Sequence, residues 1–196
     1  QIEWFESVLA HDRSHANIKT IVVGMHRALP NSYACGHSMN GDFGHESKEG
    51  IESGRRAYMD LVKWKKESGK FVYILASHSH FYMQDIFATE FWKNPAHGGA
   101  VLPGWIIGTA GAQRYALPED VSAGILKQHK AETKVSGYLL GIVHPDGSIE
   151  FDFKKVKKGD VPDAVNKLYE EKFIKWCFDE NYSGSPHPPA ASCGEK

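Results

Sequence analysis

The sequence has few cysteines, almost no excess charge and no long hydrophobic run, and each of these absences excludes a class of protein. Its 196 residues include three cysteines and carry a formal net charge of −1, so an electrostatic nucleic-acid interface is not expected. No stretch approaches the ~20 consecutive apolar residues of a membrane span, and the first residues lack the basic and apolar regions of a signal peptide. We therefore expect a soluble protein with no nucleic-acid or membrane partner.

The three cysteines show no Cys-x-x-Cys spacing, which excludes a zinc finger and a dithiol redox motif. Cys177 and Cys193 are close enough in the sequence to close a short loop, and a disulfide there would fit an oxidising compartment. The alternative is two unpaired thiols. We favour the disulfide, and with it a secreted or periplasmic location.

The chain is rich in apolar residues and in histidine. Hydrophobic residues make up 41% of the sequence and charged residues 24%, which suits one globular domain at this length. Eleven histidines are many for such a chain, and the sequence starts without Met. We interpret the missing Met as the sign of a processed protein or of a piece of a longer one.

Short apolar runs alternate with segments of helical periodicity, a pattern typical of an α/β fold. Three unbroken apolar runs have the character of strands covered on both faces, and they lie at residues 18–24, 71–76 and 105–110. Apolar residues recur at helical spacing in three segments, which are 1–10, 55–68 and 162–178. Two further runs, 138–143 and 149–156, flank a Pro-Asp-Gly turn and predict a β-hairpin.

A long segment without periodicity, residues 30–54, separates the first predicted strand from the next predicted helix. It is rich in Gly, Ser, Asn and His. A connection of this length is more often a functional loop than a plain linker, so we expect it to contribute to a site.

Histidines directly follow two of the predicted strands. His26 ends the first strand, and His78 and His80 follow the second. Because loops at the carboxyl ends of the strands in an α/β sheet meet in one crevice, these three side chains are expected to lie near one another. Imidazole is the commonest metal ligand, and Zn, Fe, Mn or Ni would suit such a cluster. The alternative is that His78 and His80 are exposed loop residues and that His26 makes an ordinary hydrogen bond.

Two segments of the sequence carry a resemblance to a known family. Thr20-Ile-Val-Val-Gly-Met-His26 is followed by Asn31-Ser32-Tyr33 and His37, and Ala76-Ser-His-Ser-His80 comes later. Together they resemble the carboxyl half of a calcineurin-like metallophosphoesterase, closest to the purple acid phosphatase branch. In that family an apolar strand leads into a metal-binding His, and a later strand leads into Gly-His-x-His, whose Gly position is Ser77 here.

The resemblance implies a layered α/β sandwich with a mixed β-sheet, of which this chain forms the carboxyl-terminal half. It implies that His26 and His78 ligate one metal ion and that His80 ligates a second, both divalent or trivalent ions of Fe, Zn or Mn. It also implies that His37 donates a proton to the leaving group or holds the phosphate. The implied activity is metal-dependent hydrolysis of a phosphate ester by this dinuclear centre.

The first motifs of the family are absent from this sequence. Asp-x-His, Gly-Asp-x-x-Asp and Gly-Asn-His-Asp/Glu supply the carboxylate that bridges the metals, and none of them lies before residue 26. Three neutral imidazoles cannot offset the repulsion between two cations, so this chain alone is expected to be inactive. The missing ligands are expected from an N-terminal half of the same protein or from a second chain.

Three segments are expected along the chain. Residues 1–156 form the carboxyl half of the metallophosphoesterase-like catalytic domain, and a C-terminal helix within 157–182 packs on it. Residues 183–196, which are rich in Pro, Ser and Gly, are expected to form a flexible tail.

Other functions stay open at this point. The chain is alternatively a non-catalytic α/β binding domain, or a decayed phosphoesterase that has lost its activity. A further alternative is a mononuclear zinc hydrolase that uses His26, His78 and His80 as a three-histidine site.

Overall fold

A four-stranded sheet forms the centre of the protein. The computed structural model describes residues 1–34, 38–39, 41–42, 45–117, 131–169 and 171–182. The strands lie in the order β1-β4-β6-β5, and their bounds are Thr20–Met25, Phe71–Ala76, Gly104–Ile107 and Tyr82–Gln84 respectively. β1, β4 and β6 are parallel, and β5 pairs antiparallel with β6. This arrangement confirms an α/β fold with a mixed sheet. β5 was not predicted, because three residues are too few to show a periodic pattern.

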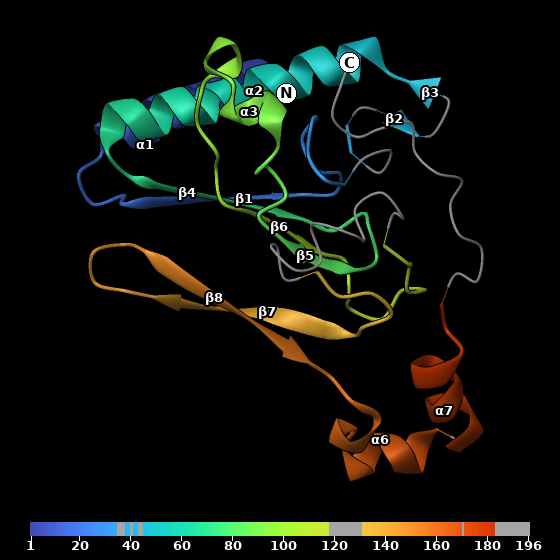
Figure 1. Cartoon of the computed structure of the whole chain (residues 1–196). Helices are drawn as coiled ribbons and strands as arrows, with labels where there is room; N and C mark the ends of the chain where they lie inside the picture. Colours follow the sequence, from blue (N-terminus) through green and yellow to red (C-terminus); the bar gives the residue numbers. More distant parts are fainter. Residues whose placement is uncertain (35–37, 40, 43–44, 118–130, 170, 183–196) are drawn as a thin grey trace.

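Two long helices, α1 (Ile2–Ser14) and α2 (Lys48–Ser68), cover one face of the sheet (Figure 1). α2 begins before the predicted residue 55, because the Ser47 hydroxyl caps it by accepting the N–H of Gly50. The loop predicted over residues 30–54 therefore ends at Ser47, before the predicted residue 54. α2 ends as predicted at Gly69, whose positive φ of 67° forms a left-handed cap.

The fold also contains several short helices and strands. Near α2 lie α3 (Glu90–Lys93) and the 3-10 helix η2 (Pro95–His97), and a two-stranded ribbon is formed by β2 (Gly41–Asp42) and β3 (His45–Glu46). None of the helices in the described residues is both long enough and apolar enough to cross a membrane.

The core between the helices and the sheet is organised around Tyr58 of α2. Its fully buried ring stacks on Trp92, with ring centroids 3.7 Å apart, and meets Phe87 edge-on. Its hydroxyl accepts the N–H of Leu102 at 2.8 Å and donates to the carbonyl of Ala100 at 3.1 Å. Burial raises the pKa of Tyr58 far above its usual range, so the hydroxyl keeps its proton. Tyr58 thereby fixes α2 to the segment that leads into β6.

A β-hairpin covers the opposite face of the sheet (Figure 1). β7 (Gly137–Val143) and β8 (Ile149–Lys155) pair antiparallel, which confirms the predicted hairpin. Phe151 and Phe153 of β8 point toward the sheet and pack on three of its aromatic side chains: Tyr73, Tyr82 and Trp105. The protein thus has a helical layer, a central sheet and a hairpin layer.

The carboxyl end of the described chain forms two short helices where one was predicted. These are α6 (Asp163–Leu168) and α7 (Glu171–Asp179), after the 3-10 helix η3 (Lys158–Asp160). α6 ends at Leu168, which is 77% exposed. The next residue, Tyr169, is extended. A helix this short depends on packing for its stability, and the predicted apolar stripe is largely exposed here. The predicted tail lies outside the described residues.

The predicted disulfide has one partner within the described residues. Cys177 on α7 is partly buried and forms no disulfide with any described residue. Cys193 lies outside the described residues. The pairing of these two cysteines therefore stays a prediction.

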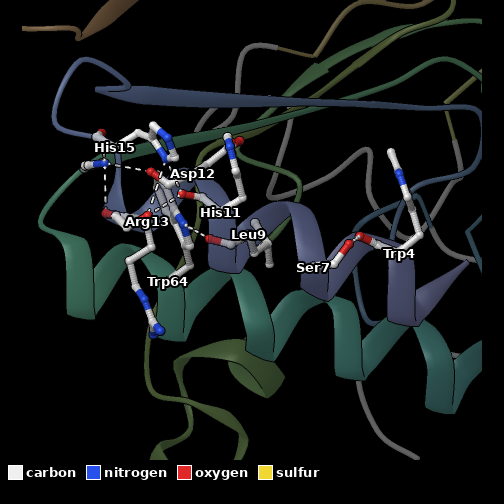
Figure 2. Close-up of polar contacts among 10 residues, drawn as sticks. Trp4, Ser7, Leu9, His11, Asp12, Arg13, His15 and Trp64 are labelled. Carbon is white, nitrogen blue, oxygen red and sulfur yellow. Dashed lines mark hydrogen bonds and ion pairs between the residues drawn. The ribbon is translucent and has the colours of Figure 1, made fainter.

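A side chain of α2 and the side chain of Lys70, the residue before β4, fix the carboxyl end of α1. Trp64 Nε1 donates to the carbonyl of Leu9 at 2.8 Å (Figure 2). The ammonium group of Lys70 donates to three backbone carbonyls at 2.7 to 3.2 Å, those of Asp12, Arg13 and His15. Carbonyls at a helix end have no partner within the helix, and a cation there also interacts favourably with the helix dipole. Lys70 therefore anchors α1 to the sheet.

Replacing Lys70 with Met is expected to lower the free energy of unfolding by about 1 kcal/mol, since three partly solvated carbonyls lose a charged donor. We expect thermal unfolding to show a Tm lowered by about 2–4 °C. Lys66→Met, in the exposed part of the last turn of α2, serves as the matched control. Equal Tm values for the two variants would contradict an anchoring role for Lys70.

Candidate metal site

The carboxyl ends of β1 and β4 bring His26 and His78 together. The two strands are paired in register along their whole length, and the carbonyl of His26 accepts the N–H groups of both Ser77 and His78. Nε2 of His26 and Nδ1 of His78 lie 2.8 Å apart, and the two rings meet edge to face. His26 is exposed and His78 is half-buried, so the pair can be reached by a ligand.

The spacing of this pair fits two ligands of one metal ion. Two imidazole nitrogens bound to a common ion at about 2.0–2.1 Å and at angles of roughly 90–109° lie about 2.9–3.4 Å apart. The observed 2.8 Å is close to the lower value. With no ion between them, one ring donates a hydrogen bond to the other.

The described residues provide only part of a complete ligand set. A structural or catalytic zinc ion takes four ligands, and two-metal sites take more. Within the described ranges, no group of three or more His, Cys, Asp or Glu side chains is arranged to hold an ion. The three-histidine zinc site considered above is therefore not assembled by His26, His78 and His80 in this structure.

His80 is held in place by the loop that follows β6. Its Nδ1 lies 2.7 Å from the carbonyl of Gln113, so Nδ1 carries the proton and the lone pair of the neutral ring is on Nε2. The ring packs on Tyr115 with centroids 4.3 Å apart, and the N–H of Tyr115 donates to the carbonyl of His80. A backbone carbonyl is one of the usual groups that orient a metal-binding histidine through its other ring nitrogen.

The loop that carries His78 and His80 packs directly on Gly108. A Cβ at residue 108 would lie 2.2 Å from the carbonyl oxygen of Ser77 and 2.3 Å from that of Ser79. Both neighbours are backbone atoms, so a side chain fits only if the loop moves. Gly108 therefore controls the path of residues 77–79, and with it the direction of both histidines.

The segment Asn31-Ser-Tyr33, which precedes His37 in the sequence, is held in place by hydrogen bonds to other parts of the fold. Asn31 adopts a positive φ of 57°, and its Oδ1 accepts a hydrogen bond from Nε of Arg55 at 2.9 Å. The hydroxyl of Tyr33 donates to the carbonyl of Ala88 at 3.0 Å, and burial raises the pKa of Tyr33. His37 itself, predicted as the proton donor, lies outside the described residues.

Tyr82, which follows the two histidines, is a core residue. Its ring stacks on Phe153 and is 4% exposed. Burial raises its pKa to about 12, with smaller contributions from the negative charges of Asp85 and Glu132. Tyr82 therefore stays protonated at neutral pH and supports the sheet beneath His80.

Sequence reasoning missed the residues that orient His80. Gln113 and Tyr115 lie in the loop after β6, which Arg114 fixes by donating to the carbonyls of Asn181 and Lys134. The available signal was the position of this loop, since it leaves the carboxyl end of a strand like the loops that carry His26 and His78. The contact itself is made by a backbone carbonyl, which no residue type reveals.

Comparisons of this chain with protein-family models, with curated proteins and with solved structures found no match.

Proposed function

We propose that this chain contributes the histidine ligands of a dinuclear metal centre that hydrolyses phosphate esters. The observation that supports this most directly is the His26–His78 pair, whose ring nitrogens lie 2.8 Å apart at the ends of adjacent parallel strands. His26 and His78 would hold one ion and His80 the second, with Fe, Zn or Mn as the ions. The fold proposed for the complete site is the layered α/β sandwich of the metallophosphoesterases.

The oxygen ligands of the proposed centre come from outside the described residues. A carboxylate must bridge the ions to offset their mutual repulsion, and no such group lies with the three histidines in the part of the chain that the structure describes. We propose that the N-terminal half of the same protein supplies it, with a separate partner chain as the alternative source.

In this proposal, residues of this chain orient the histidine ligands and donate a proton to the leaving group. Gln113 keeps the proton of His80 on Nδ1, which presents Nε2 to a ligand. Gly108 holds the loop of His78 and His80 in place, and His37 is proposed to donate a proton to the leaving-group oxygen. When bound, the metal ions supply Lewis-acid activation of the phosphoryl group and of the attacking water.

The proposed substrate is a small phosphomonoester or an organic diester. With a net charge of −1, the chain offers little of the positive charge that nucleic-acid binding requires. The proposed location is secreted or periplasmic, in keeping with the expected disulfide.

The test uses the natural intact protein, purified without chelator. We expect it to contain two equivalents of Fe, Zn or Mn and to hydrolyse p-nitrophenyl phosphate. His78→Ala should lower kcat/KM by about 100-fold or more and release metal, because a ligand is lost. The control is His144→Ala, which removes an exposed histidine near the hairpin turn. Less than one equivalent of metal, together with an unchanged rate for His78→Ala, would favour a non-catalytic binding domain.

A further inference from the structure

Two exposed histidines at the carboxyl end of α1 form a second pair, apart from the histidines of the proposed phosphoesterase centre. His11 lies in the last turn of α1, and His15 is the capping residue that follows the helix (Figure 2). Residues four apart lie on the same face of a helix. The two imidazole rings are accordingly stacked, with centroids 4.0 Å apart and planes inclined by 27°.

The pair lies at the opposite end of the sheet from His26. Lys70, the residue before β4, donates to the carbonyl of His15 at 2.7 Å, which places the pair beside the amino ends of the parallel strands. The six residues of β1 separate this end from His26, a span of about 20 Å for an extended chain. An ion held by His11 and His15 is therefore distinct from any ion held by His26.

Each ring of the pair is oriented through Nδ1. Nδ1 of His11 lies 2.9 Å from Oδ1 of Asp12, and Nδ1 of His15 lies 2.7 Å from the carbonyl oxygen of His11. Both oxygens accept hydrogen bonds, so both Nδ1 atoms carry the proton and the lone pair of each neutral ring is on Nε2. Within the described ranges, no hydrogen-bonding group contacts Nε2 of either ring.

This arrangement is typical of histidines that bind a metal ion. Such a histidine almost always donates its other ring N–H to a carboxylate or to a backbone carbonyl, which fixes the tautomer and the direction of the ring. His11 has the first kind of partner and His15 has the second. Two histidines at positions i and i+4 are also the pair with which a helix binds zinc in metalloproteases.

Capping of the helix accounts for only part of the arrangement. The carbonyl of His11 is among the last four of α1, which have no partner within the helix. The ring of His15 and the hydroxyl of Ser14 both donate to it, at 2.7 and 2.9 Å. Capping therefore explains the contact of His15, whereas the ring of His11 is oriented separately by Asp12.

The charges around the pair are compatible with a bound cation. The carboxylate of Asp12 contacts the ring of His11, and the guanidinium of Arg13 is paired with Glu67. The ammonium group of Lys70 is directed at three backbone carbonyls. The negative end of the helix dipole also lies at this end of α1. Asp12 and the helix dipole thus oppose the charge of Lys70.

We propose that Nε2 of His11 and Nε2 of His15 bind one divalent transition-metal ion, with water as the remaining ligands. Both side chains are exposed, so small rotations bring the two nitrogens to the separation of about 2.9–3.4 Å that a common ion requires. Two imidazoles and water suit the tetragonal geometry of Cu²⁺, which binds nitrogen ligands most tightly among the first-row divalent ions. Within the described ranges no third His, Cys, Asp or Glu side chain joins the pair.

The first test is a calorimetric titration of the natural intact protein with Cu²⁺ in a non-coordinating buffer. His11→Ala and His15→Ala should each weaken binding of one equivalent by about tenfold or more, because one of two ligands is lost. The control His144→Ala removes an exposed histidine near the hairpin turn and should leave this affinity unchanged. All three variants keep His26, so their differences report on the α1 pair alone.

Two results of this titration would overturn the proposal. If His11→Ala and His15→Ala bound Cu²⁺ as tightly as His144→Ala, the ion would be adventitious. If only one of the two substitutions weakened binding, a single histidine would bind the ion without its neighbour.

The second test measures thermal unfolding of the same proteins. Cu²⁺ at about 100 times its Kd should raise the Tm of the wild-type protein by about 5 °C more than that of either Ala variant, because an ion shared by both rings stabilises the folded helix. Without metal, both variants should unfold within about 2 °C of the wild-type protein, since the replaced side chains are exposed. Equal increases with Cu²⁺ would contradict a shared ion. Neither test involves turnover, so its outcome is independent of the proposed phosphoesterase activity.

Discussion

Gly108→Ala should destabilise the protein by about 3 kcal/mol and disrupt the histidine site. The new methyl group would lie 2.2–2.3 Å from two backbone oxygens of residues 77–79, and the backbone cannot rotate away as a flexible side chain can. The loop must therefore shift, and His78 must move relative to His26. Thermal unfolding measures the loss of stability, and metal content of the natural protein measures the effect on the site.

The matched control for this variant is Gly159→Ala. Gly159 lies in η3, and a Cβ there would meet no described atom within 4 Å. We expect its Tm to stay within about 2 °C of the wild-type value, because a surface substitution of this kind changes stability little. If Gly108→Ala unfolded at the same temperature as this control, the close contact of Gly108 with residues 77–79 would be refuted.

Tyr58→Ala is expected to have the largest effect on stability, about 5 kcal/mol. The substitution removes a fully buried ring that stacks on Trp92, which costs about 3–5 kcal/mol for an aromatic residue. It also leaves the N–H of Leu102 and the carbonyl of Ala100 without their hydroxyl partner. Urea unfolding measured by circular dichroism would report the change in the free energy of unfolding.

Tyr58→Phe separates the contribution of the buried ring from that of the hydroxyl group. It keeps the ring and removes only the hydroxyl, so we expect a loss of about 1–3 kcal/mol. A Phe variant as unstable as the Ala variant would show that the hydroxyl dominates, contrary to the packing argument. A stable Ala variant would contradict the placement of Tyr58 at the centre of the core.

Local pattern was sufficient to predict most of the fold. The strands at 71–76 and 20–25 are short runs of apolar residues, and the hairpin contains a turn sequence with few alternatives. The pairing of His26 with His78 follows from a general rule, since parallel neighbours end at the same edge of a sheet. These predictions depended on residues close in sequence or on topology alone.

The features that could not be predicted depend on tertiary contacts, which residue types alone do not reveal. The position of His80 is set by the carbonyl of Gln113, and the loop conformation is set by the close approach of Gly108 to residues 77–79. The division between α6 and α7 depends on the packing available to Leu168, which is largely exposed. A pattern of apolar residues shows that burial is possible, but it does not show whether a neighbouring surface is present.

The contact between Thr20 and the hairpin turn has a consequence for the rate of folding. The Thr20 hydroxyl donates to the carbonyl of Gly147, 127 residues later, and Lys19 reaches Pro145 beside it. Contacts between residues so distant in sequence form slowly. A large loop must be closed, at a cost in chain entropy, before such a contact can stabilise the protein. α2 and the hairpin can form early from local interactions, whereas docking of the hairpin on β1 belongs to the last steps of folding. Until then the aromatic face of the central sheet is exposed to water, and aggregation competes with completion of the native structure.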